Sequence, residues 1–350
     1  MTEQTGKAQD FLQIKLFLGF LTAVVVFFIF QLLKDIFIPL FMALFLYFLL
    51  NGAVERLVKL KVPRAVVLIC LLILIFVLFY FLGVLMFASV SSFIEKFPAY
   101  SKKMAETVSG LADKIKIPGV DLNAYIQRTD WSKGIDTSAV TSVLSSWFGS
   151  FSAFVGQVIL VLLFLTFMLT GKGTLTGRFS GAFADDSSHR IQTLFDSIEN
   201  QVRRYLVIKT SLCLITAVVS GVILAIGGFD FVLFSVLLIF ILNFIPEVGS
   251  IIATLVPIVF GILEFGFSLR VLFVLVALMV FQFLLGNILE PKITGRGLNL
   301  SPIVILIALI FWSYIWGIVG AILAVPLTAA LKIFLENMPT LNPLANLISE

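Results

Sequence analysis

The chain has 350 residues, of which 60% are hydrophobic and only 13% are charged, and its mean hydropathy is +1.12. Soluble domains contain about 45–50% apolar and about 25% charged residues, so this composition excludes a single water-soluble core and indicates that lipid surrounds most of the chain. The net charge of +4 does not indicate a nucleic-acid partner, because the lysines and arginines lie in short loops between apolar runs.

Long apolar runs recur along the chain, and each approaches the roughly 20 residues that a helix needs to cross about 30 Å of hydrocarbon. They cover residues 16–33, 65–88, 147–170, 206–226 and 271–289. A shorter run at 36–50 follows the first after only Lys34 and Asp35. We predict that these two runs form a helical hairpin, with Pro39 tolerated in the first turn of its second helix. The predicted fold class is all-α and polytopic.

Two less apolar segments separate the spans. Residues 89–146 combine charges of both signs with apolar positions at helical spacing, which predicts a small extracytoplasmic helical segment. An amphipathic helix is expected at 184–205, in the headgroup layer or against a neighbouring subunit. The predicted organisation is N-terminal membrane helices at 1–88, the extracytoplasmic segment at 89–146, a span at 147–170, a cytoplasmic segment at 171–205, a transport core at 206–338 and a tail at 339–350.

The basic loops predict the orientation in the membrane. Cytoplasmic loops of membrane proteins carry an excess of lysine and arginine, and here these residues gather between the second and third spans, between the fourth and fifth, and before the last apolar stretch. They are Arg56, Lys59, Lys61, Arg64, Lys172, Arg178, Arg190, Arg203, Arg204, Lys209, Lys292 and Arg296. The N-terminus is then expected in the cytoplasm.

Glycine and proline interrupt two apolar stretches near the end of the chain. Residues 231–263 break at 243–249, and residues 302–335 break around 316–320. The halves of the first stretch, about 12–14 residues each, would measure only about 18–21 Å as helices, which is too short to cross the bilayer. We therefore predict two re-entrant hairpins. With no net crossing in either, the C-terminus is also cytoplasmic.

Beyond each break the sequence continues to a Val-Pro pair, which ends at Pro257 in the first stretch and at Pro326 in the second. Paired interruptions of this kind mark the binding site in carriers built from inverted repeats. Backbone groups at a tip are tolerated at membrane depth only if the tip is buried in protein or lines a wet cavity. We predict an inverted repeat whose two tips form the solute site; two ordinary kinked spans are the alternative.

Residues at these interruptions are the candidates for solute or ion binding, since polar groups inside apolar runs are costly. They are Asn243, Pro246, Glu247, Gly249, Asn287, Glu290, Gly317 and Gly320. Three have alternatives that stay open. Asn243 could cap a broken helix, Glu247 could pair with a cation or reach the interface, and Glu290 could form a structural ion pair beside Lys292. Interfacial positions are expected for Asp230, Glu264 and Arg270.

Enzyme signatures are absent from the sequence. One histidine, His189, and two separated cysteines, Cys70 and Cys213, exclude the common zinc and nucleophile–base arrangements. We therefore predict no enzymatic activity, no metal site and no cofactor.

Several short motifs run from the first interrupted stretch through the second. They are Asn243-Phe244-Ile245-Pro246-x-x-Gly249, Asn287-x-x-Glu290-Pro291-Lys292-Ile293-x-Gly295, Leu298-x-Leu300-Ser301-Pro302 and Trp316-Gly317-x-x-Gly320-Ala321-x-Leu323-Ala324-Val325-Pro326. As a set they resemble the autoinducer-2 exporter family of bacterial membrane proteins. Structural roles are expected for Pro257, Pro291, Gly295, Ser301, Pro302 and Pro326.

The resemblance implies a multi-pass protein of the bacterial inner membrane, a homo-oligomer that exports a small polar solute such as the quorum-sensing signal autoinducer-2. A second hypothesis is sodium or lithium/proton antiport, with Glu247 or Glu290 carrying the ions. A third is a membrane scaffold without transport, which would bind a partner through residues 89–146 or 184–205. The expected partners are thus the lipid bilayer, a small polar solute or a monovalent cation and proton, and further copies of the chain.

Overall fold

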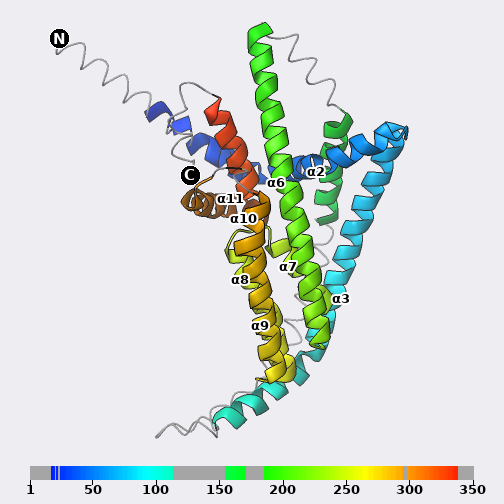
Figure 1. Ribbon diagram of the computed structural model, residues 1–350, viewed down its shortest axis with the longest axis vertical. Helices are drawn as coiled ribbons and strands as arrows, with labels where there is room; N and C mark the ends of the chain where they lie inside the picture. The colour runs from blue at the N-terminus through cyan, green and yellow to red at the C-terminus, as the bar shows by residue number, and fades with distance from the viewer. Residues whose placement is uncertain are drawn as a thin grey trace, which may run out of the picture.

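The computed structural model describes residues 17–19, 21–22, 24–112, 154–170, 185–294, 298 and 300–337 (Figure 1). The helices are Phe17–Leu32, α2 (Lys34–Lys59), α3 (Arg64–Ala112), Phe154–Thr170, α6 (Asp185–Ile226), α7 (Val232–Leu242), α8 (Val248–Phe265), α9 (Leu269–Phe283), the π-helix η2 (Leu284–Leu289), α10 (Glu290–Thr294) and α11 (Pro302–Glu336). Six candidate spans among the described residues are long and apolar enough to cross a membrane. The all-α, polytopic fold class is confirmed.

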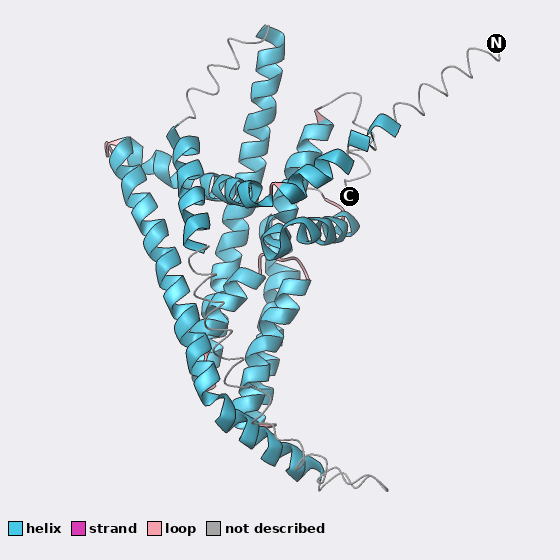
Figure 2. Cartoon of the chain, turned by 180° about the vertical axis from the view of Figure 1, so that it is seen from behind, coloured by secondary structure: helices cyan, strands magenta, loops and turns pink. Residues whose placement is uncertain are grey.

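The first helix does not form the hairpin that the sequence predicts. Helix Phe17–Leu32 continues into α2 through a bend at Leu33. The carbonyl of Leu33 accepts hydrogen bonds from the backbone N–H groups of Ile36 and Phe37 at 3.0 Å each, so the helical ladder resumes at once. The charged pair at 34–35 therefore starts a helix instead of reversing the chain, and both ribbon views show the chain going on in the same general direction (Figures 1 and 2).

Two other helices run across boundaries between predicted segments. α3 extends for 49 residues to Ala112 and so includes the start of the segment predicted at 89–146. α6 is one continuous helix of 42 residues, so the amphipathic segment predicted to end at 205 and the span predicted to begin at 206 belong to a single helix. The remainder of 89–146, residues 147–153 of the fourth predicted span, and the tail at 339–350 lie outside the described residues.

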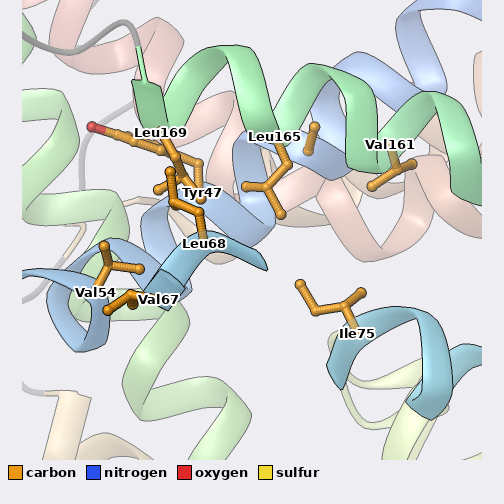
Figure 3. Packing of buried hydrophobic residues seen from close by; sticks show 9 residues of the cluster. Tyr47, Val54, Val67, Leu68, Ile75, Val161, Leu165 and Leu169 are labelled. Atoms are coloured by element: carbon orange, nitrogen blue, oxygen red, sulfur yellow. The ribbon is translucent and has the colours of Figure 1, made fainter. Parts of the chain in front are cut away.

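An apolar core joins the first part of the chain (Figure 3). Tyr47 and Val54 of α2, Val67 and Leu68 of α3, and Leu165 of helix Phe154–Thr170 are all buried in it. Polar contacts lie at one end of this core. Asn51, 1% exposed, donates to Glu199 of α6 at 2.9 Å, and Arg64 donates to the carbonyl of Leu169.

α7 and α8 fold back on each other and form hairpin 1 (residues 232–265). The backbone N–H of Asp230 donates to Glu264 Oε2 at 3.0 Å. The ring centroid of Phe231 lies 5.5 Å from that of Phe260. The residues that precede α7 therefore lie beside the end of α8, and the turn at 243–247 forms the opposite end of the hairpin.

α11 also folds back, at Gly317, and its two halves form hairpin 2 (residues 302–336). Gly317 has a non-helical backbone with φ 62° and ψ −139°. A Cβ atom on Gly320 would lie 1.9 Å from the carbonyl oxygen of Trp312, so the two arms meet closely at the tip. Further along, Leu309 shares a buried cluster with Ala324. Re-entry of either hairpin into a bilayer, and the inverted repeat, stay predictions.

α6 has different polar contacts at its two ends. Near its start, Glu199 contacts Asn51 of α2. Past its other end, Asp230 binds Lys96 and accepts a hydrogen bond from Tyr100 at 3.1 Å, both from the outer part of α3. The turn before hairpin 1 and the extension of α3 therefore share one side of the molecule, and the loop between α2 and α3 lies on the other.

Candidate functional site

A cavity of about 840 Å³ lies among α6, the tip of hairpin 1, the helix formed by α9, η2 and α10, and the start of α11. Ligand pockets in proteins measure roughly 300–1,000 Å³, so the volume suits a small solute. Polar side chains contribute to the wall from each of the first three parts. They are Tyr205, Lys209 and Thr216 of α6; Asn243, Glu247, Ser250 and Thr254 of hairpin 1; and Gln282, Asn287 and Glu290 of the third part.

The tip of hairpin 1 has a strained backbone. Glu247 has φ 55° and ψ −62°, and the N–H of Val248 bonds to the carbonyl of Pro246 at 2.6 Å, which makes a γ-turn centred on Glu247. A positive φ is rare for a residue with a side chain, and it costs about 1–3 kcal/mol wherever surrounding contacts enforce it. Such strain concentrates at functional sites, and here it places an exposed carboxylate in the wall of the cavity.

Gly249 allows this turn to close. A Cβ atom on Gly249 would lie 1.9 Å from the carbonyl oxygen of Leu242, closer than any real side chain approaches. The adjacent Asn243 is 9% exposed and lines the cavity. No side-chain bond caps the start of α8, whereas the backbone N–H of Asn243 continues the ladder of α7 by bonding to Ile239 at 3.0 Å.

A π-helical stretch forms the facing wall. Residues Leu284–Leu289 adopt the wider π turn between α9 and α10. π turns inside α-helices are rare and occur frequently at functional sites. This one contributes Leu285, Gly286 and Asn287 to the cavity, and it is followed directly by Glu290. No simple sequence pattern marks a π turn, so the sequence does not predict one here.

Lys209 and Glu290 form an ion pair across the wall, from positions 81 residues apart in the chain. Lys209 Nζ lies 2.5 Å from Glu290 Oε1, and the two side chains are 10% and 34% exposed. The sequence predicts Lys209 in a cytoplasmic loop, but it lies near the middle of the candidate span Gln192–Ile226. An ion pair of Glu290 is therefore present, but its partner is Lys209 and not the predicted Lys292, which is exposed.

The polar wall of α6 is not among the predicted site residues, because it becomes apparent only when several residues are considered together. Tyr205, Lys209, Cys213 and Thr216 are spaced four, four and three residues apart, so they share one face of the helix. Lys209, Cys213 and Thr216 are buried, and all four line the cavity. That periodicity was visible in the sequence.

The structure places the predicted site residues in three groups. Five binding candidates line the cavity, together with two residues given structural roles: Asn243, Pro246, Glu247, Asn287 and Glu290, then Pro291 and Pro302. Gly249, Pro257, Gly317, Gly320, Ser301 and Pro326 lie within or beside the two hairpins and are not among the lining residues. Gly295 lies outside the described residues.

A second polar group, at the open end of hairpin 1, is separate from the cavity. Burial, and then the hydrogen bond to Asp230, raise the pKa of Tyr100. The same carboxylate raises the pKa of Lys96 through its hydrogen bond. Both donors therefore stay protonated at neutral pH and hold α3 to the base of hairpin 1. Within the described residues, no three His, Cys, Asp or Glu side chains are grouped closely enough to hold a metal ion.

Known proteins are similar in sequence to this chain over almost its full length. The sequence profile of the AI-2E family transporter matches residues 18–340. The chain belongs to the AI-2E transporter family. The AI-2 transport protein TqsA of Escherichia coli (strain K12) is 31% identical over 318 residues, covering 90% of each chain.

Other similar proteins also carry the name of transport proteins. A putative transport protein of Haemophilus influenzae is 29% identical, covering 91% of this chain and 92% of its own. The putative transport protein YrrI of Bacillus subtilis is 28% identical, covering 87% of this chain and 86% of its own. With six candidate spans, the chain is a multi-pass bacterial membrane protein of a transporter family, and the resemblance seen in the sequence is confirmed.

Proposed function

We propose that this protein is a secondary transporter that exports a small polar solute through the cavity between α6, hairpin 1 and η2. The observation that carries the proposal is the convergence of a strained hairpin tip, a π turn and a partly buried ion pair on one cavity of about 840 Å³. Broken helices near the substrate are the usual construction of secondary carriers. Similarity to TqsA makes the signal autoinducer-2 the first cargo to test.

The chemistry of the wall favours a solute with several hydroxyl or carbonyl groups. Asn243, Gln282 and Asn287 each offer an amide donor and acceptor, and Ser250 and Thr254 offer hydroxyls. Ser250 Oγ donates to the carbonyl of Glu247 at 2.8 Å, which leaves its oxygen able to accept. Apolar side chains such as Met279 and Leu255 complete the wall, as is usual for pockets that bind small molecules.

The test is flux of autoinducer-2 through purified protein in proteoliposomes, compared with protein-free vesicles. Asn287→Leu removes a polar group from the cavity and is expected to reduce the flux by about tenfold, which corresponds to one lost hydrogen bond of about 1.4 kcal/mol. Gln201→Leu makes the same kind of change on an exposed face of α6 and is expected to leave the flux unchanged. Equal flux from all three proteins would refute the cavity as the path.

Sodium or lithium/proton antiport is the second candidate function, because the carboxylates of Glu247 and Glu290 both line the cavity. Vesicles containing a pH-sensitive dye would report proton movement when sodium or lithium is added outside. Antiport predicts a dye response that Glu247→Gln and Glu290→Gln reduce. No response from the parent protein would remove this candidate and leave solute export standing.

The proposed setting is the inner membrane, with both termini in the cytoplasm and the protein acting as a homo-oligomer. Cysteine labelling from one side of the membrane tests the orientation. Leu60, between α2 and α3, is 73% exposed, and Phe267, between α8 and α9, is 67% exposed. In intact cells an impermeant reagent should label Phe267→Cys and spare Leu60→Cys; the reverse pattern would invert the proposed orientation.

A further inference from the structure

The Lys209–Glu290 pair is the one charged link across the wall of the cavity among the described residues. It joins the middle of α6 to α10, a helix of only five residues. The Lys209 side chain is 10% exposed, so its charge is largely removed from water. Both residues line the same cavity, and the contact can therefore form or break only with a change in the cavity itself.

A buried ion pair is weak evidence for stability, because desolvation of both charges offsets most of their attraction. Apolar side chains of similar size would join α6 to α10 at least as firmly. What a pair provides instead is a contact with two distinct states. When the pair is formed, each charge is balanced by the other. When the pair is separated, each charge needs water or a polar solute as a partner, and the cavity has room for either.

The helix that carries Glu290 is less regular than the helix that carries Lys209. Glu290 follows the π turn directly. A π turn interrupts the regular i→i−4 hydrogen bonds that make an α-helix stiff. Gly286, inside that turn, has no atom within 4 Å of where its Cβ would lie, so no packing fixes the turn on that side. α6 is in contrast a continuous helix of 42 residues, which keeps Lys209 in place.

We propose that Lys209 and Glu290 are the gate pair of the cavity: they join α6 to α10 across its wall in the conformation described, and they separate when the solute enters. Lys209 thus becomes a positioning residue of the transport site. The proposal rests on the cavity being the transport path, and it names the contact that controls access to it.

Cys213 provides a native reporter that requires no cargo. It lies one turn after Lys209, lines the cavity and is 1% exposed. In full-length Cys70→Ala protein, the rate at which a maleimide reacts with Cys213 measures opening. Lys209→Gln and Glu290→Gln each break the pair and are expected to react about tenfold faster than the parent, as the open population rises. The exchange Lys209→Glu with Glu290→Lys re-forms the pair and should restore the slow rate.

Charge effects on the thiol are distinguishable from opening. Removal of a nearby cation makes a thiolate less available, whereas removal of an anion makes it more available, so charge alone would move the two single variants in opposite directions. A cysteine at Ala43, 0% exposed in the α2–α3 core, reports general unfolding and should stay unreactive in every variant.

Two results would overturn the gate. Either the single variants react no faster than the parent, or the exchanged pair reacts as fast as the singles while the Ala43→Cys reporter stays protected. Neither result depends on transport, so the export proposal would stand or fall separately on its flux measurement. Faster reaction in both single variants, reversed by the exchange, supports the gate.

Discussion

The two hairpin tips are built alike but lie in different surroundings. In each, a glycine closes the turn against the carbonyl at the end of the first arm: a Cβ on Gly249 would lie 1.9 Å from Leu242 O, and one on Gly320 would lie 1.9 Å from Trp312 O. The side chain four residues earlier is equally close in both, with Cβ atoms of Ile245 and Trp316 at 3.1 Å. This shared geometry supports the predicted repeat.

The difference lies in what each tip touches. Tip 1 presents Asn243 and Glu247 to the cavity. Tip 2 packs against aromatic rings: Trp316 lies 5.1 Å from Phe41 between ring centroids and donates its indole N–H to the carbonyl of Phe30 at 3.2 Å. The same type of turn therefore lines a polar cavity in hairpin 1 and holds hairpin 2 against the N-terminal helices. The tips still meet, since Ile245 packs in one cluster with Ala321.

Gly249→Ala and Gly320→Ala should have the largest effects on stability. Each new methyl group overlaps a backbone carbonyl that cannot rotate away, so each variant should lose about 3 kcal/mol of unfolding free energy. Melting temperatures of purified protein in detergent would show two similar losses if the tips are equivalent.

Gly156→Ala is the matched control for that experiment. It lies in helix Phe154–Thr170 with no atom within 4 Å of its Cβ position, and alanine is favoured over glycine in helices. It should be neutral or slightly stabilising. A large loss at Gly249 together with none at Gly320 would break the equivalence of the two turns.

Gly317→Ala should have the next largest effect, for a different reason. No atom lies within 4 Å of its Cβ position, so the cost is conformational: φ 62° with ψ −139° is a region that only glycine adopts readily. We expect a loss of about 2 kcal/mol in unfolding free energy. An unchanged melting temperature would mean that hairpin 2 accepts a different turn, unlike hairpin 1.

Asn243→Leu should separate the tips by function. Asn243 is 9% exposed beside the cavity, and leucine matches its shape but lacks its amide donor and acceptor. Solute flux should fall about tenfold, equivalent to about 1.4 kcal/mol, while the protein stays folded. Trp316→Phe in the other tip should lower the melting temperature but leave flux per folded molecule unchanged. Equal flux losses would show that both tips belong to the site.

The sequence revealed the tips because glycine and proline act locally. The breaks at 243–249 and 316–320 coincide with the two turns, since Gly249 and Gly317 are needed by the backbone itself. The remaining features depend on tertiary contacts. A charge at Lys209 indicates a loop until Glu290, 81 residues away, is placed beside it. The π turn and the strain at Glu247 arise from packing and have no pattern of their own.

Glu247→Gly should have the smallest effect, and the most informative one, because it sets stability against function within tip 1. Glycine adopts φ 55° freely, so the variant should gain about 1 kcal/mol of unfolding free energy. Glu247→Gln keeps the strain and removes only the charge, so its stability should match the parent. If the carboxylate takes part in transport, both variants lose flux although only Glu247→Gly is stabilised. The strained backbone is then explained by the need for a carboxylate at this position. Full flux in both variants would show that the Glu247 side chain has no part in transport and that the strain belongs to the turn alone. Tip 1 would then differ from tip 2 in the residues around it but not in its function.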